Sequence, residues 1–304
     1  MLVLNRIIVN YQQIVILFVT LQTTGFLTKV PEKYESSKSD SIITYLCTYR
    51  RLAELRRSLF YLFKNFNSKY YYPVVVFHRG DIIHHKAMRY LSRSLREDEL
   101  AVVEFIKADF INEFPPGFNA SDAVQKGVIF PNFFPNYQHM CAFWFRNIYL
   151  QQRLKQYNVK YYMRLDSDSV LLGKINYDLF HFVKENKIAY AYRTRDGEND
   201  CCAKKMMRFV YTYGKSKQLL QQFSPELSWM AKYEEFPPVN PFSDNPTGRQ
   251  PSTYYANLVI VNVAAFRDDP QVWEFIDSVW NDTLLKIHGI YRYRWGDSPL
   301  RFQV

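Results

Sequence analysis

Apolar runs and helical spacings alternate along most of this chain. Short apolar runs predict strands over residues 42–46, 73–77, 102–106, 161–165, 188–192 and 257–262. Apolar residues at helical spacing predict helices over residues 52–66, 84–95, 137–154, 204–223 and 271–285. Strands that alternate with helices are typical of a parallel sheet covered by helices on both faces. The pattern therefore predicts one α/β domain with a mostly parallel central sheet.

The amino-terminal part differs in character from the rest of the chain. A hydrophobic stretch over residues 7–27 follows a single arginine and is long enough to cross a bilayer, although polar side chains interrupt it. We expect residues 1–28 to be an uncleaved signal anchor, with a cleaved signal peptide as the alternative. Residues 29–41 are expected to form a polar stem before a folded domain at residues 42–304. This order predicts a single-pass type II membrane protein with its domain in the lumen.

Two other segments bear on the surface of the domain. A proline-rich segment from Phe236 to Pro251 is expected to be a surface loop or a lid over a cleft. The triplets that begin at Asn119 and Asn281 match N-glycosylation acceptor sequences, which a lumenal chain can use.

Composition narrows the range of functions. The chain of 304 residues carries a formal net charge of +10, and 17% of its residues are aromatic. Its basic residues are dispersed and form no nucleic-acid-binding motif, which argues against nucleic acid as a partner and favours an anionic small molecule. The four cysteines permit one or two disulfides in an oxidising lumen. None belongs to a Cys-x-x-Cys pair, so a zinc site is not expected.

The most informative chemical signal is a pair of aspartates that follows the strand at residues 161–165. Asp166 and Asp168 stand at the end of this apolar run, where open α/β sheets place their ligands. Two nearby carboxylates supply the oxygen ligands that Mn²⁺ or Mg²⁺ prefers. Such a cation neutralises a diphosphate leaving group. The pair therefore predicts a metal-dependent transferase that uses a nucleotide sugar.

Four segments, in order along the chain, resemble motifs of the fungal α-1,2-mannosyltransferases, glycosyltransferase family 15. Residues 67–77, which end in Tyr-Pro-Val-Val-Val-Phe, are similar to the family's Phe-Asn-Tyr-Pro strand, and residues 137–143 to its Tyr-x-x-Met-Cys-Arg-Phe segment. Residues 161–170 take the place of its Tyr-Tyr-Trp-Arg-Val-Glu-Pro-Asp-Val. Residues 294–299, Arg-Trp-Gly-Asp-Ser-Pro, resemble its Arg-Trp-Gly-Asp-Ala-Pro. The ordered set indicates a divergent member of this family.

The resemblance implies a GT-A fold, a Golgi membrane location and manganese (or magnesium) as cofactor. It also implies transfer of mannose from GDP-mannose onto a glycoprotein glycan with retention of configuration. By position, Asp166 and Asp168 would bind the metal and, together with Arg164, the donor. Tyr137 matches a tyrosine that faces the donor, and Asp297 matches an acidic residue on the acceptor side of the cleft. We therefore expect Tyr137 and Asp297 to act in catalysis.

Two positions depart from the family's pattern. Val259 stands where the family has a glutamate proposed as nucleophile or ion-pair stabiliser, which favours attack from the face of the leaving group. Asn257 is then expected to be a third catalytic residue, through a hydrogen bond near the donor sugar. Arg301 stands where the family has a metal-binding histidine, and it is expected to contact the donor diphosphate.

These departures leave alternatives open. The same fold with another nucleotide sugar is one, and a catalytically inactive lumenal relative that binds glycans is the other. A secreted protein or one in the ER lumen is the alternative to the Golgi membrane.

Overall fold

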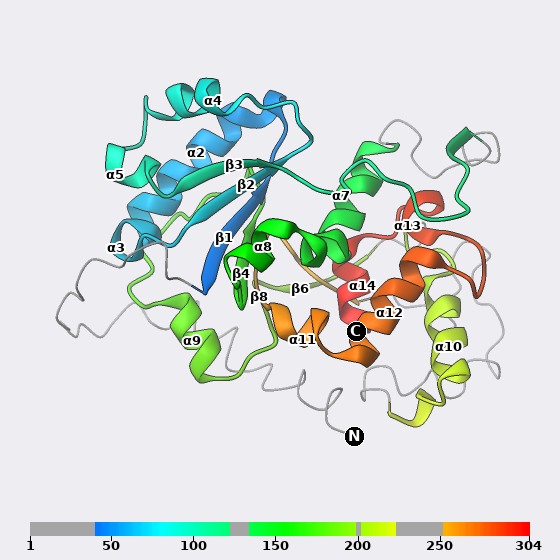
Figure 1. The fold of residues 1–304 in the computed structure, drawn as a ribbon. Coiled ribbons are helices and arrows are strands. Elements are labelled where there is room, and N and C mark those ends of the chain that lie inside the picture. Colours follow the sequence, from blue (N-terminus) through cyan, green and yellow to red (C-terminus); the bar gives the residue numbers. More distant parts are fainter. Residues whose placement is uncertain (1–39, 122–133, 199–201, 223–251) are drawn as a thin grey trace.

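The computed structural model describes residues 40–121, 134–198, 202–222 and 252–304 (Figure 1). The expected anchor, nearly all of the expected stem and the proline-rich segment lie outside the described residues. Within the described ranges, no helix has both the length and the apolar character needed to cross a bilayer.

A six-stranded sheet forms the centre of the fold, with strand order β3–β2–β1–β4–β8–β5. Its strands are β1 (Ser41–Leu46), β2 (Val74–His78), β3 (Val103–Lys107), β4 (Tyr161–Leu165), β5 (Tyr190–Tyr192) and β8 (Leu258–Asn262). Strands β1 to β4 run parallel, and β8 runs antiparallel to its neighbours β4 and β5. The prediction of a mostly parallel sheet is confirmed, and every strand begins and ends within two residues of its expected bounds.

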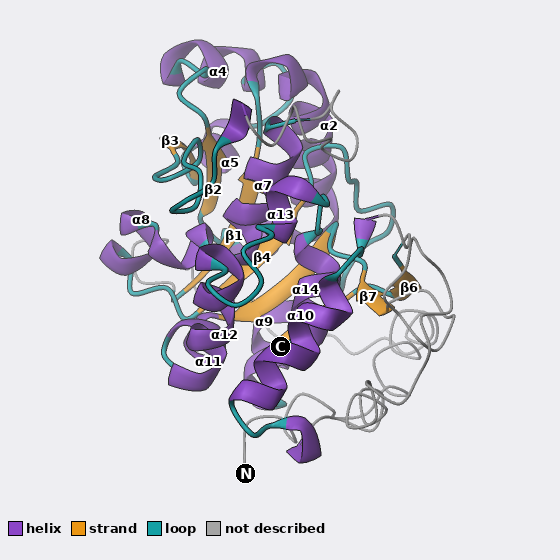
Figure 2. Cartoon of the chain, turned by 90° about the vertical axis from the view of Figure 1, so that its right-hand side faces the viewer, coloured by secondary structure: helices purple, strands orange, loops and turns teal. Residues whose placement is uncertain are grey.

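Helices cover both faces of this sheet (Figure 1, Figure 2). One face packs against α2 (Leu52–Leu62), α4 (His84–Leu91) and α9 (Leu179–Glu185). The other packs against α7 (Asn136–Phe145), α8 (Gln152–Gln156), α10 (Met206–Ser216), α11 (Val263–Arg267), α12 (Pro270–Asn281), α13 (Gly289–Arg292) and α14 (Asp297–Gln303). Along β1, Ile43 enters the first core and Ile42 the second. Burial on both faces explains why the strands are continuous apolar runs.

All five expected helices differ in their bounds from the observed ones: α4, α10 and α12 end four to seven residues earlier than expected, and the other two are interrupted. The helix expected over 52–66 is α2 followed by a π-helical turn, Phe63–Asn67. The helix expected over 137–154 is broken at Arg146 into α7, a 3-10 turn and α8. At the break, Arg146 turns its guanidinium to Asp277 of α12, with Nη2 2.6 Å from Oδ1. Tertiary contacts of this kind are invisible to a local helical pattern.

The apolar pattern does not predict three short elements. Helix α9 begins at the carboxylate of Asp178, which accepts hydrogen bonds from the backbone N–H groups of Phe180 and His181. Strands β6 (Arg195–Gly197) and β7 (Ser252–Tyr254) pair antiparallel as a second, two-stranded sheet beside α14 (Figure 2). These strands are three residues long, and β6 is exposed throughout, so neither has an apolar signature.

The strand order places a topological switch between β1 and β4. From β1 the chain adds β2 and β3 on one side, and it then returns to add β4 on the other side. In open α/β sheets, ligands bind beyond the carboxyl ends of the strands at such a point. Here these ends are Leu46 of β1 and Leu165 of β4, so the residues that follow them form the expected site.

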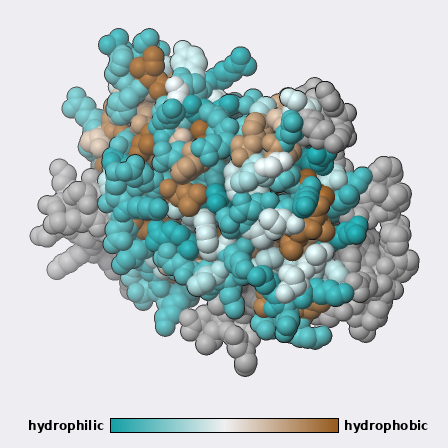
Figure 3. Space-filling model, turned by 45° about the vertical axis from the view of Figure 1, so that its right-hand side comes forward, coloured by the Kyte–Doolittle hydropathy of each residue, from teal (hydrophilic) through white to brown (hydrophobic). Residues whose placement is uncertain are grey.

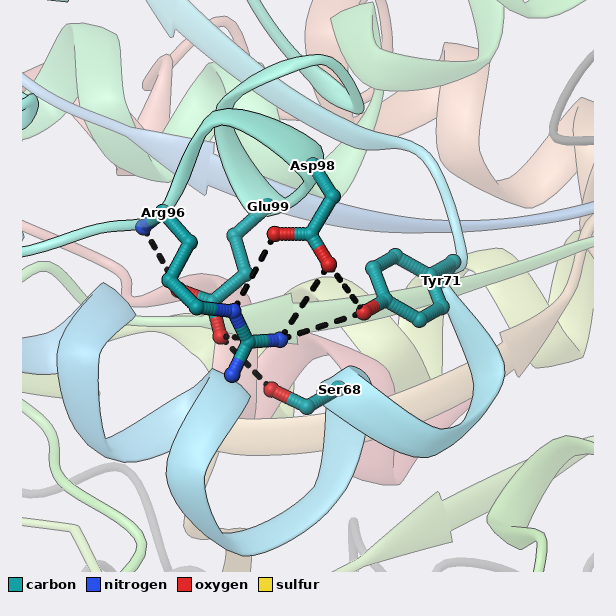
Figure 4. A network of polar contacts seen from close by, with 5 residues as sticks. All are labelled: Ser68, Tyr71, Arg96, Asp98 and Glu99. Atoms are coloured by element: carbon teal, nitrogen blue, oxygen red, sulfur yellow. Dashed lines mark hydrogen bonds and ion pairs between the residues drawn. The ribbon is translucent and has the colours of Figure 1, made fainter.

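A polar network fixes the other end of β2 (Figure 4). The Tyr71 hydroxyl donates to Asp98 Oδ2 at 2.5 Å, and Arg96 Nε donates to Asp98 Oδ1 at 3.1 Å. Ser68 Oγ donates to Glu99 Oε1 at 2.7 Å. These bonds join α3 (Ser68–Tyr70) to α5 (Glu97–Leu100). Because they lie at the end of β2 away from the topological switch, we assign them a structural role.

The face shown in Figure 3 is largely hydrophilic where the residues are described. Apolar residues on it form small separate patches between polar side chains. Isolated apolar side chains are normal at a water-exposed surface and by themselves mark no docking site.

Arg301 lies in the core on α14 and is only 4% exposed. Its Nη2 donates to the backbone oxygens of Trp144 at 3.0 Å and Phe145 at 2.6 Å. The rings of Phe145, Tyr149 and Phe266 surround the guanidinium, at 4.7 to 5.0 Å from its carbon to each ring centre. Carbonyl oxygens in the last turn of a helix have no hydrogen-bond donor within the helix. Arg301 is the donor for two such oxygens at the end of α7. This inward position corrects the expectation that Arg301 contacts the donor diphosphate.

We predict that Arg301→Met lowers the free energy of unfolding by about 2 to 4 kcal/mol, because it removes charged hydrogen bonds and leaves buried carbonyls unsatisfied. Chemical denaturation of the two proteins measures this change. The control is Arg208→Met on the exposed side of α10, which should change stability by less than about 0.5 kcal/mol. Unchanged stability together with weaker nucleotide binding would show that Arg301 faces the donor after all.

Candidate active site

A cleft of about 880 Å³ opens at the carboxyl ends of β1 and β2. Its walls come from the residues after these strands, from residues 111–112 and from the first turns of α7. This volume lies within the usual range for pockets that bind small molecules and cofactors. The cleft therefore lies at the edge of the sheet where the strand order predicts a ligand.

Three arginines line this cleft: Arg50 and Arg51 after β1, and Arg79 after β2. Arg79 is held by Asn112, whose Oδ1 accepts from Nε at 2.8 Å, and by Asn136. Three guanidinium groups in one cleft favour an anionic ligand such as a diphosphate. Neither the apolar pattern nor the family resemblance pointed to these arginines, although each follows a parallel strand at the same edge of the sheet.

Arg164 joins two of the expected site residues. It lies on β4 and is 5% exposed. Its Nη1 donates to Asp297 Oδ2 at 2.5 Å, and its Nε donates to Asp166 Oδ1 at 3.1 Å. The ring of Trp144 lies under the guanidinium at 4.5 Å. The structure thus brings Arg164, Asp166 and Asp297 together, as expected for one site.

The charges in this group shift one another's pKa values. Burial acts to lower the pKa of Arg164, but the Asp166 and Asp297 carboxylates outweigh it and hold that pKa above its usual range. Burial raises the pKa of Asp166, while Arg164 opposes this effect and the nearby Asp297 and Asp168 add to it. Negative charge therefore accumulates around Asp166, which favours the approach of a cation.

Asp166 and Asp168 offer the oxygen ligands for a metal. Asp168 Oδ2 accepts from Arg51 Nη2 at 3.2 Å, and each carboxylate keeps its second oxygen without a hydrogen bond to any described residue. Among the described residues, no group of three or more His, Cys, Asp or Glu side chains is placed to hold a metal. Hard carboxylate oxygens fit Mn²⁺ or Mg²⁺, but phosphate oxygens and water must complete the shell.

Asn257 and Val259 lie next to this group across the β4–β8 pair. The Asp166 N–H donates to the backbone oxygen of Asn257 at 3.2 Å. The side-chain Oδ1 of Asn257 is buried and has no hydrogen-bond partner among the described residues, so its capacity to accept a hydrogen bond is unused. Val259 is the direct cross-strand partner of Arg164 and is 2% exposed. An aliphatic side chain thus faces Arg164 where the family's pattern has a carboxylate.

Tyr137 forms part of the cleft wall at the start of α7. The guanidinium of Arg294 lies over its ring at 4.1 Å. The neighbouring Cys141 thiol and burial raise the pKa of the Tyr137 hydroxyl. This hydroxyl therefore stays protonated at neutral pH and can donate a hydrogen bond to an anionic ligand. The expected contact of Tyr137 with a donor stays a prediction.

Close packing before α14 sets the position of Asp297. Trp295 is fully buried, and its Nε1 donates to the backbone oxygen of Lys204 at 2.8 Å. A Cβ on Gly289 would lie 2.2 Å from the Trp295 ring, so only glycine allows the ring to pack there. Asp297, two residues later, begins α14 and is directed at Arg164.

The thiols take no part in a disulfide among the described residues. Cys47, Cys141 and Cys202 are buried, and none of these three forms a disulfide with another described cysteine, while Cys201 lies outside the described residues.

The fold is similar to solved structures of two fungal proteins. With "Core-mannan synthase A (CmsA/Ktr4) from Aspergillus fumigatus, Mn/GDP-form", the TM-score is 0.68 at 15% identity, over 92% of this chain and 76% of that one. With the mannosyltransferase Ktr4p from S. cerevisiae in complex with GDP, the TM-score is 0.65 at 20% identity, over 88% and 66%. At these identities the likeness concerns the fold, which is GT-A-like as expected.

Curated fungal relatives match at low identity. "O-glycoside alpha-1,2-mannosyltransferase homolog 5" from Schizosaccharomyces pombe is 24% identical over 198 residues, 59% of this chain and 44% of that protein. "Glycolipid 2-alpha-mannosyltransferase" from Saccharomyces cerevisiae is 22% identical over 274 residues, 88% and 56% of the two chains. The chain therefore spans about half the length of these relatives.

The family model described as glycolipid 2-alpha-mannosyltransferase matches residues 11–302. The matched range contains the aspartate strand, the cleft arginines and the segment Arg-Trp-Gly-Asp-Ser-Pro that precedes and begins α14. The chain therefore belongs to the glycolipid 2-alpha-mannosyltransferase family, glycosyltransferase family 15, as a divergent member.

Proposed function

We propose that this protein transfers mannose from GDP-mannose to a glycan on a glycoprotein, with retention of configuration. The observation that carries the proposal is the contact of Arg164 with Asp166 and Asp297 beside the arginine-lined cleft at the topological switch. Membership of the mannosyltransferase family supports the sugar, and the two similar solved structures, a Mn/GDP form and a complex with GDP, support the nucleotide.

The residues of the cleft and those next to Arg164 have different roles in binding the donor. Arg50, Arg51 and Arg79 neutralise the diphosphate. Asp166 and Asp168 would hold Mn²⁺ (or Mg²⁺), which when bound stabilises the charge of the departing diphosphate. Tyr137 donates a hydrogen bond to the donor from the cleft wall, and Asn257 Oδ1 accepts one from a sugar hydroxyl.

Attack comes from the same face as the leaving group. Val259 supplies no nucleophile, so a covalent intermediate at this position is excluded. The acceptor oxygen bonds to the anomeric carbon as the bond from that carbon to the phosphate oxygen breaks. The acceptor proton passes to an oxygen of the departing diphosphate. Asp297, held by Arg164, orients the acceptor hydroxyl, and no step requires a protein carboxylate at Val259.

We expect Asp168→Asn, or excess chelator, to abolish transfer, because the departing diphosphate then loses the metal's positive charge and keeps only that of the cleft arginines. Asn257→Ala removes a single positioning hydrogen bond and should retain measurable turnover after a loss of about a hundredfold. Transfer from GDP-mannose to a mannoside acceptor with Mn²⁺ present measures both, and circular dichroism checks that both variants fold. Full activity in excess chelator would disprove the metal requirement.

We expect Val259→Glu to raise transfer from GDP-mannose, on the order of tenfold to a hundredfold, since a carboxylate beside Arg164 stabilises positive charge on the donor sugar. Val259→Gln is the matched control, because it has the same shape without the charge and should give no increase. NMR of the product identifies the anomer. An inverted product from the wild-type chain rules out the retaining mechanism.

Val259 also favours a second candidate function. A relative that binds glycans without turnover has no need of a carboxylate opposite Arg164. Absence of turnover for every nucleotide sugar tested, in both the wild-type chain and Val259→Glu, supports this function. Turnover of another nucleotide sugar but not GDP-mannose supports the same fold with a different donor.

We further propose a Golgi membrane protein of type II topology, anchored by residues 1–28, with a secreted or ER-lumenal protein as the alternative. The hydrophobic stretch, the polar stem and the family support this location. In sealed microsomes the domain should resist added protease and become sensitive once detergent is present. Digestion without detergent would place the domain on the cytosolic side.

A further inference from the structure

Arg51 connects the arginine-lined cleft to the aspartate pair. It lies in the cleft wall just after β1. Its Nη2 donates to Asp168 Oδ2 at 3.2 Å, and its Nε pairs with Glu54 Oε2 at 2.9 Å. The side chains of Arg51 and Asp168 are 49% and 48% exposed. Water therefore screens this ion pair, and its contribution is small.

We propose that Arg51 is a donor-binding residue that couples the nucleotide to the metal, an inference that rests on the proposed function. A nucleoside diphosphate in the cleft draws Arg51 Nη2 away from Asp168 to a phosphate oxygen. Asp168 Oδ2 then becomes available to a divalent cation. In the absence of nucleotide, Arg51 itself neutralises Asp168.

The direction of this exchange follows from charge and geometry. A diphosphate carries more negative charge than a single exposed carboxylate, and arginine binds phosphate through two parallel hydrogen bonds. The guanidinium is planar and rigid, so Nη2 changes partner only when the whole Arg51 side chain rotates. Glu54, in the first turn of α2, pairs with Nε and is a second anionic partner of Arg51. The exchange is thus a rotation of one half-exposed side chain.

The same exchange predicts how the two ligands affect each other. Because the charge of Arg51 beside Asp168 opposes a cation on that carboxylate and the nucleotide draws Arg51 away, nucleotide and metal must favour each other's binding equally. Direct bonds between metal and phosphate add to this coupling in every variant. A matched comparison is therefore needed, and Arg50 provides it. It lines the same cleft but forms no ion pair with Asp168 in the described part of the chain.

The test measures Mn²⁺ binding to the full chain by electron paramagnetic resonance, with and without saturating GDP, and GDP binding by calorimetry, with and without Mn²⁺. In the wild-type chain each ligand should tighten the other by about fivefold or more. Arg51→Gln should tighten Mn²⁺ binding in the absence of GDP by about threefold, the scale of one exposed ion pair, and should reduce the coupling. Arg50→Gln should weaken GDP binding. It should leave unchanged the Mn²⁺ affinity in the absence of GDP and the coupling between GDP and Mn²⁺.

The outcomes separate this inference from the proposed function. If GDP and Mn²⁺ bind but Arg51→Gln leaves the Mn²⁺ affinity without GDP unchanged, the inference is wrong and the proposed function stands. If the wild-type chain binds neither GDP nor Mn²⁺, both are wrong. Arg50 and Arg51 are exposed, so the melting temperatures of both variants should match that of the wild-type chain.

Discussion

The buried charge of Arg164 is the constraint on which the site depends. A guanidinium removed from water costs several kcal/mol unless close partners compensate it. Asp297 and Asp166 provide that compensation, and Trp144 covers the flat face of the group. Arg164 and Asp297 are 133 residues apart in the chain, so this single contact ties β4 to α14. Without it, α14 would bury the uncompensated carboxylate of Asp297, and Arg164 would keep only Asp166 as an ion-pair partner.

Helix α14 directs two charged side chains to different tasks. Asp297 and Arg301 are one helical turn apart. Asp297 forms an ion pair with Arg164, whereas Arg301 donates hydrogen bonds to the carbonyl oxygens at the end of α7. Val259 removes a possible anionic partner from the strand opposite Arg164, so Asp297 and Asp166 remain as its ion-pair partners. Of the two departures from the family's pattern, Val259 thus removes a negative charge opposite Arg164, and Arg301 adds a buried cation whose Nη2 is bonded to the end of α7 while Nη1 has no partner among the described residues.

The two ion pairs of the site differ in burial, and therefore in how easily their partners exchange. The pair of Arg164 with Asp297 is deeply buried, so its attraction is little screened and its geometry is rigid. The pair of Arg51 with Asp168 is half exposed, so water competes for both partners. Rigid charges suit the positions where bonds change, and exchangeable ones suit the positions where ligands enter and leave. The fixed pair joins β4 to α14, and the exchangeable pair joins the residues after β1 to those after β4.

The sequence by itself determined the strands of the central sheet and the aspartate pair, because apolar runs and the Asp166-Ser167-Asp168 spacing are local signals. It did not show that Arg51 and Arg79 share a cleft, since that depends on which strands are neighbours. Only the tertiary structure showed that Asp297 pairs with Arg164 and that the Arg301 side chain is buried against the end of α7. The physical reason is that a charged side chain in isolation is compatible with solvent, a ligand or a buried partner. Packing around it decides among them, through the cost of leaving a charge or a carbonyl unpaired.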